Sequence, residues 1–286
     1  MDISFVLAGQ AGQGVQTVES LLTTAIELRH ITLVRGDRTI LRDVDLRIPK
    51  GSCCAILGPN GSGKSALVAV LAGFMWPSSG EVIVEGRSFG QVDLSDVRRS
   101  IGMVEPSRSP GFAAESPVWE VVATGLFGAF MLPIGTELNP LQVDHVDAEI
   151  QAMGLASLRE HPFGRLSTGE QMKTLLARAM VGDVRILLLD EPTAGLDMGA
   201  RAACVGALER LSARSTPPTV IVVTHHLDEL PRTVDQVVLL KKGAVLEAGS
   251  HERVLTSDTL SRLFDCRVTV FRQDGRFVAS VTDGAW

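Results

Sequence analysis

The sequence lacks tyrosine, has few cysteines and contains no long hydrophobic run. Among its 286 residues, the four cysteines form no Cys-x-x-Cys pair and no metal-ligand spacing. This argues against a zinc site and a disulfide framework, and free thiols fit a reducing cytosol. The longest apolar stretch, residues 121–132, is too short to cross a bilayer as a helix. We therefore expect a cytoplasmic protein whose membrane role requires a partner chain.

Positive charge is also scarce. Lys and Arg number 27 against 33 Asp and Glu, a formal net charge of −6, and no basic cluster occurs. We therefore expect no binding to a nucleic-acid backbone. No cationic segment precedes the first apolar residues, so we expect no signal peptide. The length is sufficient to bury a substantial core.

The strongest motif is residues 58–65, which match G-x-x-x-x-G-K-[ST] at every fixed position. An apolar run of strand length precedes the motif and an apolar run without breakers follows it, which is the order that a phosphate-binding loop requires. Backbone N–H groups and the helix N-terminus favour phosphate there. We expect Lys64 to reach the β- and γ-phosphates and the Ser65 hydroxyl to bind Mg²⁺. The expected nucleotide-binding residues are Gly58, Pro59, Asn60, Gly61, Ser62, Gly63, Lys64, Ser65 and Ala66. The alternative is a glycine-rich turn that binds nothing.

A second motif follows an all-apolar run. Residues 186–189, Ile-Leu-Leu-Leu, suit a central parallel strand that delivers Asp190 and Glu191 to the carboxyl edge of the sheet. We expect Asp190 to hold Mg²⁺ through water, and Glu191 to orient or deprotonate the attacking water as a catalytic residue with Lys64. A solvated acidic turn is the alternative.

The segment Leu-Ser-Thr-Gly-Glu-Gln at 166–171 precedes this strand, and with the motifs in this order residues 26–264 resemble the ATP-binding-cassette (ABC) family. The resemblance implies ATP as the nucleotide. It also implies that a signature segment caps the γ-phosphate held by the opposite subunit, here Ser167, Thr168, Gly169 and Glu170. Thr168 stands where the family usually has Gly, and Glu170 replaces the usual Gln. Without the family, Ser167 and Glu170 predict a capping box.

Three further positions follow from the resemblance. Asp197 lies in a segment like the D-loop, which crosses the dimer interface in the family. His225 matches the switch histidine that senses the γ-phosphate, and we expect a catalytic role for it. The family usually stacks adenine on an aromatic near position 35, and we expect the Arg35 guanidinium to take that place. His226 is expected to have no role.

The expected fold class is α/β, a P-loop NTPase with a RecA-like core, an N-terminal antiparallel β layer and an inserted α-helical subdomain. Strand-like runs at 26–29 and 41–46 suggest the β layer, and residues 118–131 and 143–153 carry helical apolar spacing. Residues 237–240 and 245–247 are predicted edge strands. We divide the chain into an extension of unknown role (1–25), an ABC ATP-binding domain (26–264, helical subdomain about 106–182) and a C-terminal β-hairpin appendage (265–286).

The predicted function is Mg²⁺-dependent ATP hydrolysis by the cytosolic motor subunit of an ABC transporter. We expect a homodimer or a paired nucleotide-binding subunit, with a separate transmembrane permease, at the inner face of the cell membrane. Residues 124–128 and 144–163 resemble a branch that includes molybdate-type importers. Two alternatives remain: a soluble ABC ATPase that acts in regulation or on a macromolecule, and an ATP-gated scaffold that barely hydrolyses.

One departure favours the soluble alternative. After residues 101–104 the family places a glutamine that reaches Mg²⁺ and links to the permease, whereas this chain has Glu105 and Pro106. We expect Glu105 to contribute little to metal binding. We expect coupling to use the apolar helical face around Trp119, Leu126 and Phe127. The alternative is a helical subdomain in which these side chains pack internally.

Overall fold

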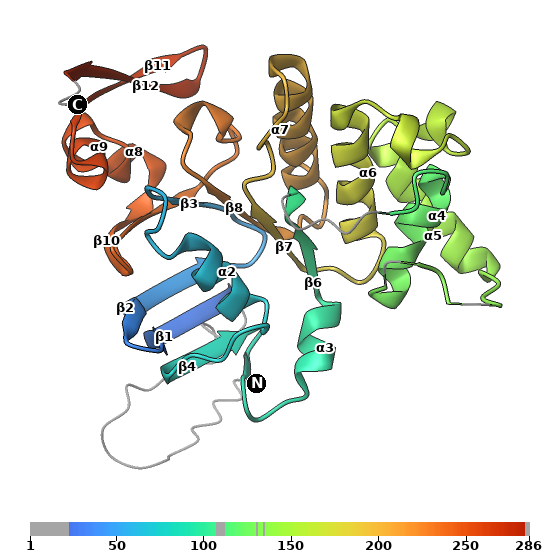
Figure 1. Cartoon of the computed structure of the whole chain (residues 1–286), viewed down its shortest axis with the longest axis horizontal. Coiled ribbons are helices and arrows are strands. Elements are labelled where there is room, and N and C mark those ends of the chain that lie inside the picture. The colour runs from blue at the N-terminus through green and yellow to red at the C-terminus, as the bar shows by residue number, and fades with distance from the viewer. Residues whose placement is uncertain (1–22, 107–111, 130, 134, 284–286) are drawn as a thin grey trace, which may run out of the picture.

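The computed structural model describes residues 23–106, 112–129, 131–133 and 135–283 (Figure 1). Its strands are β1 (Thr24–Arg35), β2 (Arg38–Pro49), β3 (Cys53–Leu57), β4 (Ser79–Val84), β5 (Arg87–Ser88), β6 (Ile101–Val104), β7 (Ile186–Asp190), β8 (Thr219–Thr224), β9 (Gln236–Lys241), β10 (Ala244–Ser250), β11 (Arg267–Gln273) and β12 (Arg276–Asp283). Its α-helices are α2 (Lys64–Leu71), α3 (Leu94–Arg99), α4 (Val118–Ala123), α5 (Pro140–Ala152), α6 (Thr168–Met180), α7 (Met198–Ser212), α8 (His251–Val254) and α9 (Ser257–Phe264). The 3-10 turns are η2 (Thr124–Phe127), η3 (Ala156–Leu158), η4 (Phe163–Arg165) and η5 (Leu227–Glu229). Nearly all of the predicted extension lies outside the described residues.

The core of the molecule is a six-stranded sheet of order β10-β9-β3-β8-β7-β6. Its pairs are parallel except for β9 with β10. Every residue of β3, β7 and β8 is buried, which explains their unbroken apolar sequences. The prediction of an edge strand at 237–240 was wrong: β9 pairs with both β3 and β10, and its Val-Val-Leu-Leu run is buried because layers cover both faces.

The N-terminal part forms a separate antiparallel sheet of order β2-β1-β4-β5. Helix α2 lies between the two sheets, because its Leu67, Val68 and Leu71 share one buried cluster with side chains from both (Figure 1). The second cluster, on the other side of the parallel sheet, joins β3, β7 and β8 to α4, α5, α6 and α7. The predicted α/β class with an antiparallel β layer is confirmed.

The helical segment between β6 and β7 is less regular than its apolar spacing predicts. The expected helix at 118–131 ends as an α-helix at Ala123 and continues only as the 3-10 turn η2. A Cβ on Gly125 would lie 2.1 Å from the Arg178 carbonyl oxygen, so the chain approaches α6 too closely for a larger residue. Gly128 then adopts a left-handed φ of 60°, which ends the turn.

The C-terminal strands β11 and β12 pair antiparallel around a turn at Asp274 and Gly275. The hairpin contacts the rest of the chain through an ion pair of 3.3 Å between Arg276 Nη2 and Glu209 Oε1 on α7. Val268 also belongs to the buried cluster that β3, β7 and β8 share with α4–α7, and Val270 packs against that cluster. The predicted hairpin is therefore anchored to the nucleotide-binding core by both charge and apolar contact.

The turn between β9 and β10 buttresses the loop before α2. The Gly243 N–H donates to the Ser62 carbonyl oxygen at 2.9 Å, and the Gly243 carbonyl accepts from the Arg42 N–H at 2.8 Å. A Cβ on Gly243, whose φ is +82°, would lie 2.3 Å from the Ile40 carbonyl oxygen. This glycine therefore holds β2, the turn and the loop together.

We predict that Gly243→Ala destabilises the protein far more than Gly36→Ala. Gly36 also has a positive φ, but its Cβ would meet nothing within 4 Å. Left-handed strain should lower the free energy of unfolding by about 1 kcal/mol in both variants. The clash at Gly243 should cost roughly 2 kcal/mol more. Denaturant unfolding measures the difference, and equal losses would contradict the proposed buttress.

Candidate nucleotide-binding and hydrolysis site

The loop at 58–63 connects β3 to the start of α2 and requires its glycines. Gly63 is the N-cap of α2 with φ 105°, and Gly61 has φ 77°. A Cβ on Gly58 would lie 2.3 Å from the Leu240 carbonyl oxygen. The Ser62 hydroxyl is buried and has no hydrogen-bond partner among the described residues. A loop with a free buried hydroxyl at a helix N-terminus fits a phosphate group.

Lys64 is the buried cation of this loop. Its side chain is only 6% exposed, and Nζ donates to the carbonyl oxygens of Gly58 at 2.8 Å and Pro59 at 3.2 Å. Burial lowers the pKa of Lys64, whereas the negative charges of Glu191 and Asp190 act to raise that pKa. The predicted lysine and both predicted acids therefore lie within electrostatic reach of one another.

The residues predicted to hold Mg²⁺ have the chemistry of a magnesium site. Asp190 is buried at the end of β7, and Ser65 is exposed on the first turn of α2. Among the described residues, no group of three His, Cys, Asp or Glu side chains converges at this loop. Mg²⁺ commonly takes one or two protein oxygens and completes its shell with substrate phosphates and water. The residues present fit that pattern.

Glu191 and His225 meet at the ends of neighbouring parallel strands. Glu191 follows β7 and adopts a positive φ of 50°, and its N–H donates to the Val223 carbonyl oxygen at 2.8 Å. His225 follows β8, and its Nδ1 lies 3.0 Å from Glu191 Oε1. Both side chains are about one-third exposed, at 33% and 34%. The pair is therefore partly desolvated yet accessible. The imidazole of His226 packs at 3.9 Å between ring centroids against that of His225.

The signature segment forms the start of α6. Ser167 is the N-cap and makes a capping box with Glu170, as predicted: the Ser167 N–H donates to Glu170 Oε2 at 2.8 Å. Hydrogen bonds from the Ser167 hydroxyl and backbone hold the pKa of the Glu170 carboxyl below its usual value. A Cβ on Gly169 would lie 3.0 Å from the Ala200 Cβ, so a side chain at 169 would crowd the contact between α6 and α7.

Asp197 caps the helix that Gly169 contacts. Its Oδ1 accepts the Ala200 N–H at 2.7 Å, which fixes the start of α7. By their contacts, the predicted site residues thus form two groups. One contains Lys64, Asp190, Glu191 and His225; the other contains the signature residues and Asp197.

Arg35 lies at the exposed end of β1. Its Nη2 donates to the Trp76 carbonyl oxygen at 3.3 Å, and the Trp76 side chain is 51% exposed beside it. Trp76 was not among the predicted site residues. The Pro77 that follows it favours a turn, and an aromatic ring in a turn is often exposed. The adenine-stacking role of Arg35 remains a prediction.

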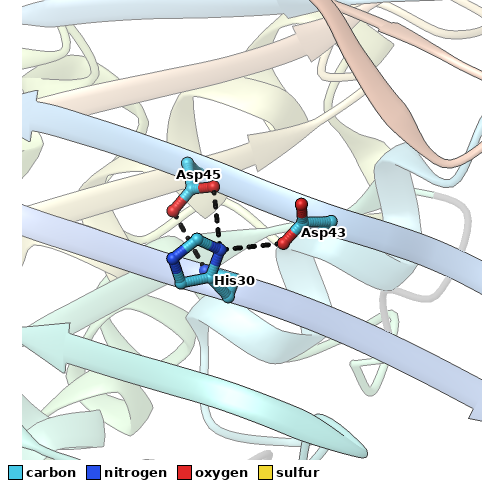
Figure 2. Close-up of side chains that lie close together, drawn as sticks. All are labelled: His30, Asp43 and Asp45. Atoms are coloured by element: carbon cyan, nitrogen blue, oxygen red, sulfur yellow. Dashed lines mark hydrogen bonds and ion pairs between the residues drawn. The ribbon is translucent and has the colours of Figure 1, made fainter.

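His30, Asp43 and Asp45 gather on the exposed face of β1 and β2, and none of them belongs to the predicted site (Figure 2). His30 Nδ1 lies 2.9 Å from Asp43 Oδ1 and 3.5 Å from Asp45 Oδ2. The hydrogen bond with Asp43 and the two negative charges raise the pKa of His30. The hydrogen bond of His30 with Asp43 and its nearness to Asp45 account for the cluster without an additional ligand.

Comparison with known proteins decides the family. A family model described as ABC transporter matches residues 41–194, just over half of the chain, and this range includes both the phosphate loop and the signature segment. The chain belongs to the ABC transporter family. The predicted family and fold class are confirmed.

Individual ABC proteins match over most of their length. An uncharacterized ABC transporter ATP-binding protein, YmeB of Lactococcus lactis, is 31% identical over 254 residues, which cover 89% of this chain and 97% of that protein. The structure of cbiO1 from Clostridium perfringens, part of the ABC transporter complex cbiONQ, aligns with a TM-score of 0.72 and 27% identity over 84% of this chain and 94% of that one. The dimeric cassette MJ0796, bound to ADP and Pi after hydrolysis, aligns with a TM-score of 0.65 and 26% identity over 79% of this chain and 98% of that one.

As an ABC protein of this kind, the chain binds ATP and hydrolyses it as the motor subunit of a transporter. The soluble alternative finds no support in these comparisons. Among the helices of the described residues, none is both long and apolar enough to cross a bilayer.

We predict that Lys64→Ala weakens ATP binding by at least about tenfold, because a charge-assisted contact to phosphate is lost. Calorimetry measures the affinity, and far-UV circular dichroism should show that the variant remains folded. Lys50→Ala is the matched control, because Lys50 pairs with Glu85 at 3.1 Å, outside the loop. Equal ATP affinity in wild type and Lys64→Ala would refute the assignment of this loop.

Proposed function

We propose that each ATP site of this ABC motor is built from two subunits that join head to tail. The first group (Lys64, Asp190, Glu191 and His225) supplies one side, and the signature residues 167–170 of the second copy, or of a paired nucleotide-binding subunit, supply the other. The contact of 3.0 Å between His225 Nδ1 and Glu191 Oε1 carries the first side of the proposal, because it joins an imidazole to a carboxylate whose charge acts on the buried lysine.

Two features support a partner over the start of α7. Met198 is 88% exposed directly after Asp197, which is unusual for a large apolar side chain at a helix start. The dimeric state of MJ0796, a solved relative, agrees with such a contact. We propose that this surface is covered by the partner subunit when ATP is bound.

We infer one step for each side chain. The Glu191 carboxylate orients the attacking water and accepts its proton, while Lys64 attracts the transferred phosphate group. The His225 imidazole now faces Glu191, and we propose that it turns to donate to the γ-phosphate oxygen when ATP binds. Ser65 and Asp190 are the residues that would hold Mg²⁺, which neutralises phosphate charge when bound. Arg35 is proposed to stack on the adenine.

Glu170 adds a charge that the family's usual glutamine lacks. Its carboxyl stays ionised because Ser167 donates to it, so one negative charge lies at the surface proposed to face the partner's γ-phosphate. We propose that this charge weakens closure of the ATP-bound dimer and so favours release after hydrolysis.

A groove beside the helical segment is the proposed docking surface for the permease. It has a volume of about 1030 Å³ and lies between β6 and α3 on one side and η2 and α6 on the other. Leu126 and Phe127 line it together with Glu105 and Arg178. Trp119 does not: it lines a different hollow and packs against Arg159. We therefore propose that Leu126 and Phe127 contribute to the coupling face and that Trp119 does not. The molybdate-type branch remains a prediction.

We predict that Glu191→Gln keeps ATP binding but slows turnover by about a hundredfold or more, because an amide cannot accept the proton from water. Phosphate release measures turnover, and size-exclusion chromatography should show an accumulated ATP-bound dimer. Glu252→Gln is the control, because the Glu252 side chain is 74% exposed, and its turnover should match that of wild type. A wild-type chain with no Mg²⁺-dependent phosphate release, alone or with its permease, would instead support the scaffold alternative.

We also predict that Phe127→Ser lowers permease-stimulated hydrolysis while sparing basal hydrolysis, because the changed side chain lies in the proposed docking groove. Leu141→Ser is the matched control, since Leu141 is 71% exposed on α5 and does not line the groove. In calorimetry, Glu105→Ala should leave Mg²⁺-ATP affinity almost unchanged. Loss of Mg²⁺ dependence in Glu105→Ala would show that Glu105 has replaced the missing glutamine.

A further inference from the structure

Glu229 is a buried acid for which the proposed chemistry has no use. It ends the 3-10 turn η5 and is only 4% exposed. Its Oε2 accepts the hydroxyl of Thr224 at 2.7 Å, and the same hydroxyl accepts the N–H of His226 at 3.1 Å. Thr224 and His226 flank His225. The Glu229 carboxylate therefore fixes the backbone on both sides of the switch histidine.

The other oxygen of Glu229 faces α7. Its Oε1 lies 3.5 Å from Nη1 of Arg201, which also lies 3.6 Å from Oδ2 of the exposed Asp228. Nε of Arg201 is buried and has no hydrogen-bond partner among the described residues. The Arg201 side chain as a whole is 34% exposed, and Glu229 is the more buried of its two ion-pair partners.

Arg201 belongs to the turn of α7 that the D-loop residue caps. Its N–H donates to the Asp197 carbonyl oxygen at 2.9 Å. The preceding residue, Ala200, is the one that Gly169 of the signature helix approaches. A continuous set of contacts thus runs from the starts of α6 and α7, through Arg201, Glu229 and Thr224, to His225.

We propose that Glu229 is a positioning residue that couples the start of α7 to the orientation of His225. This inference rests on the proposed function, in which partner contacts cover the start of α7 and His225 moves between Glu191 and the γ-phosphate. Closure of the dimer against Asp197 and Met198 then shifts Arg201. The carboxylate transmits the shift to Thr224, and the imidazole reaches the phosphate only in the closed dimer.

The first test separates the two contacts of Glu229. Glu229→Gln keeps an oxygen that can accept from Thr224 but removes the charge that faces Arg201, and Thr224→Val removes the hydroxyl while keeping the shape. Both should lower kcat for ATP hydrolysis by about tenfold or more, because small displacements of a reacting group are costly. KM should stay within about twofold. Thr224→Ser restores the hydroxyl and should recover kcat.

The control is Asp228→Asn. Asp228 lies on the same turn and faces the same Arg201 Nη1, but no hydrogen bond joins it to Thr224, and it is 57% exposed. Its kcat should equal that of wild type. Thermal unfolding of each variant verifies that the chain is folded at the assay temperature. A fall in kcat of equal size in Asp228→Asn would show that general loss of charge around Arg201 is the cause, and would overturn the proposal.

The second test asks whether Glu229 acts through His225. In a His225→Ala background, Glu229→Gln should change single-turnover hydrolysis by less than about twofold, because residues that act as a unit are not additive. A further loss of about tenfold would place the effect elsewhere and overturn the proposal. An active wild type with unchanged Glu229→Gln turnover would overturn this inference alone. A wild type without ATPase activity would overturn the proposed function as well.

Discussion

The burial of one ammonium group constrains the whole nucleotide site. Lys64 is almost completely enclosed, and burial alone lowers its pKa and so disfavours the charged form. The loop carbonyls of Gly58 and Pro59 and the acids at the end of β7 offset that cost. Positions of β3, β7 and α2 are thereby linked: the loop must fold back over its own lysine, and the acids must lie at the same edge of the sheet.

The folding of the loop over Lys64 requires backbone segments to approach one another closely. Gly58 lets the loop lie against the end of β9, and Gly243 lets the next turn lie against β2. A milder form of the same device occurs where α6 meets α7, because a Cβ on Gly169 would crowd the Ala200 side chain at 3.0 Å. Three glycines that are far apart in sequence thus bring the phosphate loop, the antiparallel sheet and the signature helix into fixed positions.

The sequence was sufficient to predict the parts that depend on local pattern. The loop at 58–65, the buried strand before Asp190 and the capping box at Ser167 each follow from a few adjacent residues. Contacts between distant segments were not predictable in this way. Nothing near Glu229 in the sequence indicates a partner on α7, and the apolar spacing of 118–131 gives no sign that Gly125 meets the Arg178 backbone. The prediction of an edge strand at 237–240 was wrong for the same reason, since strand order is a property of the whole sheet.

The departures from the family pattern are not equivalent in physical terms. Thr168 is exposed at the start of α6, where the cap is supplied by Ser167, so a side chain at 168 meets no steric limit there. Glu170 keeps the capping box and adds a charge. The replacement at 105 is different, because Glu105 lies in the wall of the groove between β6 and η2. Changes in the signature segment therefore act on the ATP contacts proposed for it, whereas the change at 105 alters the surface through which the motor is proposed to meet its permease.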